Sequence, residues 1–395
     1  MPALAYKNAD QSAPPDAAFL GDVRAFLATA LTPDLRDAGR NTTGVHSEIA
    51  ACRLWHRRLF DRGWIAPAWP RAFGGTDWTP AQRMLFEREC AANDAPVLFA
   101  GGLRSLGPLL IAAGSPSQQR RYLSAILNGR DLWCQGFSET GAGSALAALQ
   151  TRAIANGNHY VVSGAKIWTT GAHIANRMFC MVRTGHGAKP QDGITFLLVD
   201  MATPGIAVKP ILTIDGEHEF NEVFFDDVRV PLENRVGGEN EGWAVAKDLM
   251  RLARSNNTTS GLLRRALRRA WHILESHGQA DAPAARLALC ELDCELRAFE
   301  ALELKVLSLS QGQGVTAAQA SMLKTLATEL HQKIAAAALD IAGPAAASAS
   351  AACSGWLAEG RFAATKYLAT RAASIYSGTN ETHRNLIARD LNGAV

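Results

Sequence analysis

Three short segments combine glycines, hydroxyl groups and an indole in a way that suits binding of a group that becomes negatively charged. Cys134–Ser144 interleaves Gly with Ser and Thr, so its amides can approach a ligand closely and its hydroxyls can donate to it. Gly164–Thr170 adds a tryptophan, which offers apolar area and one donor. In Ile375–Asn385, Thr379 or Asn380 can cap a helix whose first amides face an anion. Each segment alone fits an ordinary turn, a core indole or a helix cap, so their combination carries the prediction.

Two further features could have a chemical role, but we favour a structural interpretation of both. Arg104, within a Gly-rich stretch, could hold a substrate carboxylate with two parallel hydrogen bonds, and we favour instead an ion pair or a solvent-facing guanidinium. Glu217–Glu219 reads Glu-His-Glu, which could bind a metal or relay a proton. We favour a solvated turn there.

The apolar periodicity divides the chain into helical, β and helical parts, which we expect at 1–130, 131–238 and 239–395. Short amphipathic runs such as Ser115–Leu127 predict an N-terminal helical domain. Strand-like runs with Gly, Pro and Asp turns then predict an antiparallel barrel or sandwich without intervening helices. These runs are Thr151–Ala155, His159–Ser163, Phe179–Arg183, Thr195–Val199, Ile206–Pro210 and Glu222–Phe225.

The C-terminal part predicts long helices that pack as a four-helix bundle. One apolar stripe follows a helical period through Leu292, Leu296, Phe299, Leu302 and Val306, and Glu291, Glu295 and Glu303 are expected off it. The predicted fold class is therefore α+β, with an N-terminal helical domain, a middle antiparallel β domain and a C-terminal bundle.

Composition excludes several classes of function. With 40 basic and 37 acidic residues, and no basic run, the 395-residue chain does not suit nucleic acid. Seven scattered cysteines form no CxxC pair, which disfavours a metal site and suits a reducing compartment. We expect no signal peptide, because the first thirty residues have no basic segment followed by an apolar one. We also expect no membrane span, because no segment approaches roughly 18 consecutive apolar residues, and we expect a cytoplasmic location.

The three chemical segments, together with Gly63–Pro67 near the N-terminus, resemble the acyl-CoA dehydrogenase family in order and spacing. The resemblance runs from about Trp55 to Leu391, and its nearest-looking branch is the large subunit of pimeloyl-CoA-type dehydrogenases. It implies FAD as cofactor and an acyl-CoA or related thioester as substrate. It also implies a homo-oligomer, or a hetero-oligomer with a homologous subunit, and leaves the electron acceptor unknown.

The resemblance also implies which residues contact the cofactor, with Trp168 against the flavin ring and Thr170 near its N5 atom. The residues matched to FAD contacts are Gln135, Phe137, Ser138, Gly143, Ser144, Trp168, Thr170, Gly378, Thr379 and Glu381. The chain departs from the family at Thr140, where Pro is usual, at Ala145, where Asp is usual, and at Asp340, where Gln or Glu is common.

The catalytic glutamate of the family is missing from both positions where it occurs. Proton removal next to a thioester carbonyl needs a base, and the family supplies a Glu directly before the Gly-Thr of its last segment or on the first C-terminal helix. Here these positions hold Ser377 and Ala253, and the usual neighbouring Arg254 is retained. Neither an Ala methyl nor an unactivated Ser hydroxyl can take the proton.

Three functions follow as alternatives. The chain is expected to be a flavin-dependent oxidoreductase that uses a replacement base or performs flavin chemistry that needs none. Alternatively, it is a non-catalytic FAD- and CoA-binding subunit of a hetero-oligomeric acyl-CoA dehydrogenase. A CoA-ester binder or regulator ranks third.

Overall fold

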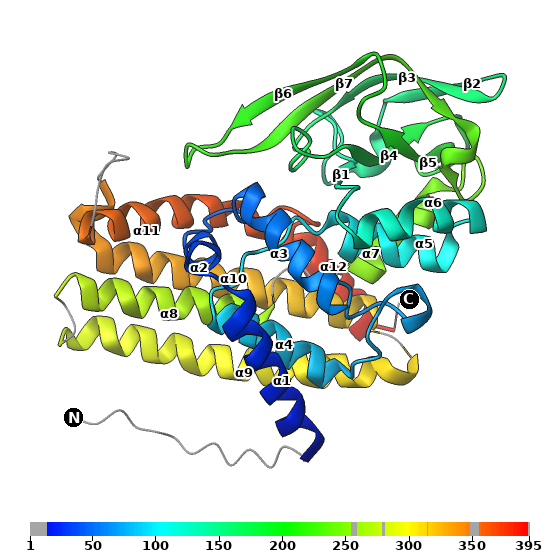
Figure 1. The fold of residues 1–395 in the computed structure, drawn as a ribbon. Coiled ribbons are helices and arrows are strands. Elements are labelled where there is room, and N and C mark those ends of the chain that lie inside the picture. Colours follow the sequence, from blue (N-terminus) through cyan, green and yellow to red (C-terminus); the bar gives the residue numbers. More distant parts are fainter. Residues whose placement is uncertain (1–13, 254–258, 279–280, 314, 348–354, 394–395) are drawn as a thin grey trace.

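The computed structural model describes residues 14–253, 259–278, 281–313, 315–347 and 355–393. A β domain lies above two groups of helices, one from each end of the chain (Figure 1). The predicted α+β class, with helical, β and helical parts in that order, is confirmed. None of the helices in the described ranges is long and apolar enough to cross a membrane.

The N-terminal helices begin where the sequence places capping residues. Thr79 and Ser115 each accept a hydrogen bond from the amide three residues on, and the side-chain oxygens of Gln82 and Gln118 accept one from the amide of the cap residue. A proline occupies the first position of each helix, where no intrahelical amide is needed. The elements are α1 (Pro14–Ala30), α2 (Pro33–Arg40), α3 (Ile49–Arg62), α4 (Pro80–Ala92), the π-helical η2 (Gly101–Leu106), α5 (Gly107–Ala113) and α6 (Pro116–Leu127).

The middle domain is an eight-stranded sheet with strand order β6-β7-β3-β2-β4-β5-β8, and β1 pairs with β4. Its strands are β1 (Trp133–Gly136), β2 (Arg152–Asn156), β3 (His159–Lys166), β4 (Arg177–Arg183), β5 (Ile194–Asp200), β6 (Ile206–Leu212), β7 (His218–Pro231) and β8 (Arg235–Val236). The expectation of a wholly antiparallel sheet needs a correction, because β1 and β4 run parallel. Between them the chain makes the β2–β3 hairpin, so β4 returns beside β1 through a crossover rather than a tight turn.

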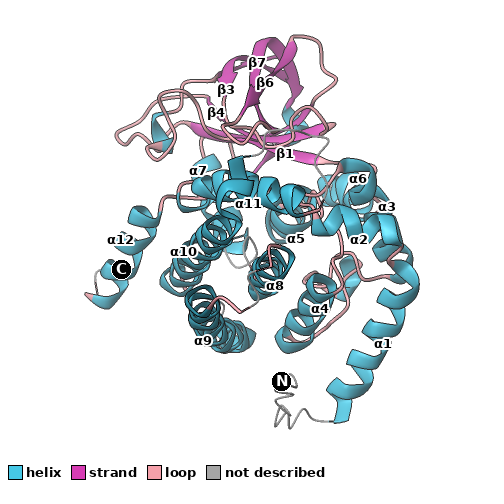
Figure 2. Cartoon of the chain, turned by 90° about the vertical axis from the view of Figure 1, so that its left-hand side faces the viewer, coloured by secondary structure: helices cyan, strands magenta, loops and turns pink. Residues whose placement is uncertain are grey.

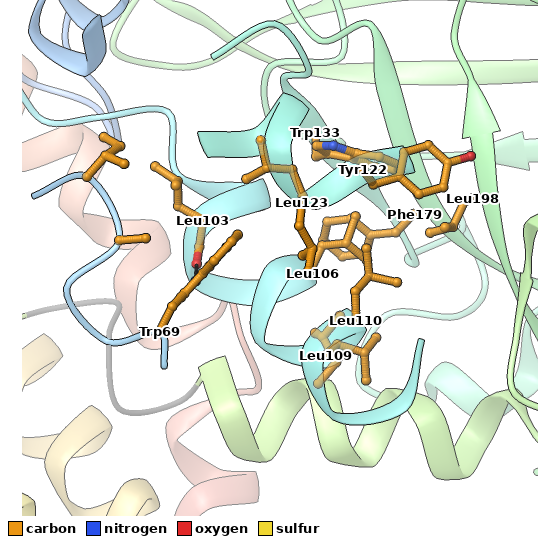
Figure 3. Close-up of a cluster of buried hydrophobic side chains, with 14 of the residues drawn as sticks. Trp69, Leu103, Leu106, Leu109, Leu110, Tyr122, Leu123, Trp133, Phe179 and Leu198 are labelled. Carbon is orange, nitrogen blue, oxygen red and sulfur yellow. Dashed lines mark hydrogen bonds between the residues drawn. The ribbon is translucent and has the colours of Figure 1, made fainter. Parts of the chain in front are cut away.

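Strands β4 and β5 are apolar on both faces, because each face packs against a different layer. Phe179, Met181, Phe196 and Leu198 join the core of the N-terminal helices, whereas their neighbours in sequence join the core inside the β domain. Figure 3 shows the first of these cores, where Leu106 and Leu110 lie against Phe179. The Trp69 indole donates to the carbonyl of Leu103 at 2.9 Å, which fixes η2 within the same core.

The C-terminal helices form the predicted bundle, and a helix from the other end of the chain joins it. The helices are α7 (Gly242–Ala253), α8 (Ser260–Ser276), α9 (Pro283–Gln313), α10 (Ala317–Ala342), α11 (Trp356–Thr370) and α12 (Asn380–Leu391). The view along the bundle in Figure 2 shows α4 beside α8, and α4 contacts both α8 and α9. Helix α7 packs instead on α5, η2 and β5.

The burial of Glu303 on α9 corrects one sequence expectation. Glu291 and Glu295 are exposed as expected, but Glu303 is buried, with 5% of its surface accessible. Its carboxylate accepts a hydrogen bond from the amide of Ser260 at 3.2 Å, at the first residue of α8. A periodicity analysis assigns one apolar face to each helix, whereas α9 has neighbours on further faces in α8 and α4.

Candidate active site

The first two chemical segments, Cys134–Ser144 and Gly164–Thr170, lie side by side and are joined by a buried ion pair. The Lys166 ammonium contacts the Glu139 carboxylate at 2.7 Å and donates to the carbonyl of Phe137 at 3.2 Å. The amide of Ile167 donates to the carbonyl of Ser138 at 2.9 Å, and that of Thr151 donates to Glu139 at 2.9 Å. The start of the glycine-rich loop is therefore fixed to β3 by side-chain and backbone bonds.

The charge balance of this anchor favours the ionised carboxylate. Burial alone would raise the pKa of Glu139, but the Lys166 ammonium and the Thr151 and Gln150 donors outweigh it and hold the pKa below its usual value. Lys166 and Glu139 have 0% and 9% of their side chains accessible, so water screens the pair little. The anchor therefore holds an ionised, hydrogen-bonded carboxylate and its ammonium partner at the start of the loop.

Beyond the anchor the loop opens to the surface. Gln135, Gly143 and Ser144 are exposed, and a Cβ built on Gly143 meets no atom within 4 Å. Phe137, in contrast, is buried and packs edge-on against the ring of Phe179, with ring centroids 5.8 Å apart. Phe137 can thus offer a ligand only its backbone, whereas the exposed loop residues can offer side chains and amides.

Two residues of the chemical segments adopt a left-handed backbone conformation that their side chains disfavour. Six non-glycine residues within the described ranges have positive φ, and four of them are Asp or Asn, which tolerate it. The other two are Trp168, with φ 59°, and Ser377, with φ 55°. Strain of this kind, on the order of 1–3 kcal/mol, persists where surrounding structure enforces it, and often marks a functional site.

Trp168 is also unusually exposed for a large aromatic residue. Its side chain is 55% accessible, although its edge packs on Phe220 with ring centroids 6.1 Å apart. The next residue, Thr169, is buried, and Thr170 is half-buried. The strained turn therefore presents an indole face at the surface with a threonine hydroxyl nearby in sequence, an arrangement that fits a planar ligand.

The third chemical segment, Ile375–Asn385, is held by α10. The Lys324 ammonium donates to the carbonyl of Gly378 and to the Asn380 side chain, both at 2.8 Å. Thr379 is the residue that caps α12, since its hydroxyl accepts from the amide of Thr382 at 3.2 Å, while Asn380 is buried. Glu381 is exposed, and its own amide and the Thr379 hydroxyl lower its pKa. Its carboxylate therefore lies at the helix N-terminus proposed to face an anion.

The family carries its glutamate at one of two positions, which here hold Ser377 and Ala253. Ser377 is exposed and its carbonyl accepts from the His383 ring at 3.0 Å. Ala253 is the last residue of α7. The side chain of Ala253 and the whole of Arg254 lie outside the described residues.

Arg104 lies on η2, and its guanidinium is 3.9 Å from the Glu87 carboxylate of α4. The two side chains are 37% and 33% accessible, so this contact is a partly solvated ion pair. Arg104 therefore has an acidic neighbour, and its contact with a substrate carboxylate stays a prediction.

The Glu-His-Glu triplet is only partly the solvated turn that we favoured. His218 stacks on His173, with ring centroids 4.0 Å apart, and Glu219 is half-buried and accepts from the amide of Val45 at 2.5 Å. Burial raises the pKa of Glu219. No group of three His, Cys, Asp or Glu residues among the described ones is arranged to hold a metal. Glu219 instead joins the middle domain to the N-terminal domain, a contact without a local sequence signal.

Sequence profiles of one family match the chain in three consecutive parts. The profile of the acyl-CoA dehydrogenase N-terminal domain matches residues 15–130, that of the middle domain 134–228, and that of the C-terminal domain 240–392. Among relatives, the acyl-CoA dehydrogenase IpdE1 of Mycobacterium tuberculosis is 35% identical over 387 residues, which cover 95% of this chain and 97% of IpdE1.

Solved structures with the same fold include two-protein assemblies. The ChsE4-ChsE5 complex from M. tuberculosis matches with a TM-score of 0.81 and 27% identity, over 96% of this chain and 98% of that one. The Tcur3481-Tcur3483 steroid ACAD matches with a TM-score of 0.80 and 25% identity, over 96% and 98% of the two chains.

Proposed function

The chain belongs to the acyl-CoA dehydrogenase family, and from that premise we propose that it is an FAD-dependent oxidoreductase that acts on an acyl-CoA or related thioester without the family's glutamate. The observation that carries the proposal is the backbone strain at Trp168 and Ser377. Both residues lie in the segments matched to flavin contacts, and neither is of a type that tolerates positive φ.

The chain's residues would divide the work of holding the cofactor. The exposed Trp168 would cover one face of the ring, while Ser138, Thr170 and the amides of the glycine-rich loop would donate to its polar edge. FAD, when bound, would accept the hydride that leaves the β-carbon of the thioester. The Glu139–Lys166 anchor would keep these donors in place, so that they need not reorganise as charge develops.

The missing glutamate sets the expected rate. Neither Ser377 nor Ala253 carries a group that holds the α-proton, so the usual reaction should be about 100- to 10,000-fold slower than with a positioned base. We expect Ser377→Glu or Ala253→Glu to increase flavin reduction by an acyl-CoA, measured anaerobically as loss of oxidised-flavin absorbance. The matched controls Ser377→Gln and Ala253→Gln add similar bulk without a base and should give no increase.

Two results would contradict the proposal. Purified protein that takes up no flavin under any loading condition would show that FAD is not its cofactor. The oxidoreductase activity would be contradicted by two results on flavin-loaded protein. These are no reduction by any acyl-CoA tested and no productive reoxidation of the chemically reduced form by oxygen.

The assemblies among the structural relatives favour a second function. In this alternative the chain is a non-catalytic FAD- and CoA-binding subunit that pairs with a homologue carrying the base. Co-expression with such a homologue should then give a mixed oligomer by light scattering, in which activity depends on the partner's glutamate. A homo-oligomer of this chain that turns over substrate would exclude this alternative.

A further inference from the structure

A cavity of about 120 Å³ lies at the meeting of the helical bundle and the N-terminal domain. Its walls come from α8, α10, α11, the segment 39–45 and Val97. Tyr376 also lines it and is the one described lining residue within the three segments matched to flavin. Most of the wall is apolar, including Ile273, Ala338 and Phe362. The cavity is thus shaped for a small hydrocarbon group along most of its surface.

Its polar lining is basic. Four lining residues are cationic: Arg40, Arg265, Arg269 and Lys366. None of the described residues that line it is acidic. The lining therefore has an excess of positive charge in an otherwise apolar space.

Two of these cations form ion pairs with carboxylates. The other two donate to backbone carbonyls and have a carboxylate among their charged neighbours, Glu219 for Lys366 and Asp94 for Arg265. Arg40 contacts Asp37 at 2.8 Å, and Arg269 contacts Glu359 at 2.9 Å. Lys366 donates to the carbonyl of Thr43 at 2.7 Å, and Arg265 donates to the carbonyl of Ala95 at 2.8 Å. An ammonium has three donors and a guanidinium five, so both retain hydrogen-bonding capacity after these bonds.

Burial and repulsion from neighbouring cations lower the pKa values of three basic groups that line the cavity. Burial, and then the charge of Arg265, lower the pKa of Lys366 to about 8, while Glu219 opposes them. Burial, and then Lys366, Arg265 and Arg371, lower the pKa of His331 to about 3. Burial also lowers the pKa of Arg265 to about 10. A bound anion would relieve the repulsion that these neighbouring groups share.

We propose that this cavity binds the carboxylate end of a short apolar acid, with the carboxylate between Lys366 and Arg265 and the hydrocarbon along α10. The volume supports this size, because a cavity of about 150 Å³ accommodates benzene, with its six heavy atoms. A straight-chain acid of four or five carbons, with six or seven heavy atoms, is comparable in size. The proposal stands whether or not the chain dehydrogenates a thioester.

Two residues of the lining, Val45 and Tyr376, adjoin other parts of the candidate site. Val45 is exposed, its amide is bound by Glu219 of β7, and Tyr376 directly precedes the strained Ser377. The bound acid would therefore be a free molecule or the far end of a longer ligand that also reaches the candidate site. Both sources present the same carboxylate to the same cations.

Titration of the whole purified chain with sodium valerate tests the site directly, with calorimetry at pH 7 and no dependence on flavin reduction. We expect saturable binding with a Kd of about 1–5 mM, as suits a seven-atom ligand. Valeramide, the neutral isostere, should bind about 10-fold more weakly or not at all. A glutaric mono-CoA thioester that displaces valerate, when the butyryl thioester does not, would identify an acyl ligand as the source, and displacement by neither would identify a free acid.

Two variants change the cavity in different ways, one in its charge and one in its volume. Lys366→Met removes one cation, and Ala338→Leu fills the apolar space while it leaves every charge in place. Each should weaken valerate binding about 10-fold or more, while the exposed Lys333→Met, also a loss of lysine from the bundle, should change it less than about 2-fold.

The proposal fails if valerate shows no saturable binding up to about 20 mM, a concentration several times the expected Kd. Equal binding of valerate and valeramide would show an apolar cavity without anion recognition. Stronger binding of inorganic phosphate than of valerate would also overturn it, since the carboxylate and its hydrocarbon would then not be what the cavity selects. Unchanged affinity in folded Ala338→Leu would place the ligand elsewhere.

Discussion

Two buried glutamates in different domains differ in the one contact that decides their charge. Glu139 of the middle domain and Glu303 of the bundle are 9% and 5% accessible, and each accepts backbone amide hydrogen bonds. Glu139 has the Lys166 ammonium at 2.7 Å, whereas Glu303 caps the start of α8 with the acidic Glu87 and Glu300 among its charged neighbours. Burial raises the pKa of Glu303 to about 7, and the pKa of Glu139 lies below its usual value.

The comparison shows that burial alone does not determine ionisation in this protein. Amide donors reduce the desolvation cost of a carboxylate at both sites, but only the buried cation outweighs it. The middle domain thus holds a fixed ion pair under its proposed cofactor loop. The bundle holds a carboxylate that titrates near neutral pH.

Removal of the cation from the middle domain should have the largest effect. Lys166→Met leaves Glu139 buried without its counterion, and we expect it to destabilise the protein by about 3–5 kcal/mol, as for other broken buried pairs. Denaturant unfolding at pH 7 measures the loss. The double variant Lys166→Met/Glu139→Gln should recover much of it, because no unpaired charge is then buried, and a double variant as unstable as the single one would contradict the role of that charge.

Neutralisation of the bundle glutamate should have the opposite sign. Above its unfolded pKa near 4.5, Glu303 ionises in the unfolded chain before it does so in the folded one, so stability falls as pH rises to about 7. Glu303→Gln keeps an acceptor for the Ser260 amide and removes this cost. We therefore expect it to stabilise the protein by up to about 3 kcal/mol at pH 8 and little at pH 4.5, from unfolding measured at both values.

The exposed Glu291 of the same helix provides the control for that experiment. Glu291→Gln should leave the stability difference between the two pH values unchanged. A Glu303→Gln variant that is destabilised equally at both pH values would show that the carboxylate serves α8 only as a hydrogen-bond cap.

An exposed ion pair of the same geometry should have the smallest effect. Lys333 contacts Glu295 at 2.8 Å, nearly the distance of the buried pair, but the two side chains are 56% and 48% accessible. Lys333→Met should change the free energy of unfolding by less than about 1 kcal/mol, and less again at high salt. A loss comparable to that of Lys166→Met would mean that contact distance, rather than burial, sets the strength of these pairs.

Much of the fold could be predicted from the sequence, because it is encoded over short distances. Helix starts such as Thr79 and Ser115 carry their own caps, and strand alternation and turn residues marked the β2–β3 hairpin around Gly157. The parallel pairing of β1 with β4 could not be predicted, because its partners are more than 40 residues apart. The chain path between them leaves no local pattern.

The candidate site divides in the same way. The sequence by itself determined the family, the segments proposed to hold the cofactor and the absence of a glutamate at Ser377 and Ala253, since residue identity and spacing suffice for these. Only the tertiary structure decided that Glu303 is buried, that Glu219 reaches Val45, and that Lys366 shares a cavity with Arg265 and His331. A side chain's charge and burial depend on neighbours that folding brings from other elements, and the local sequence does not specify those neighbours.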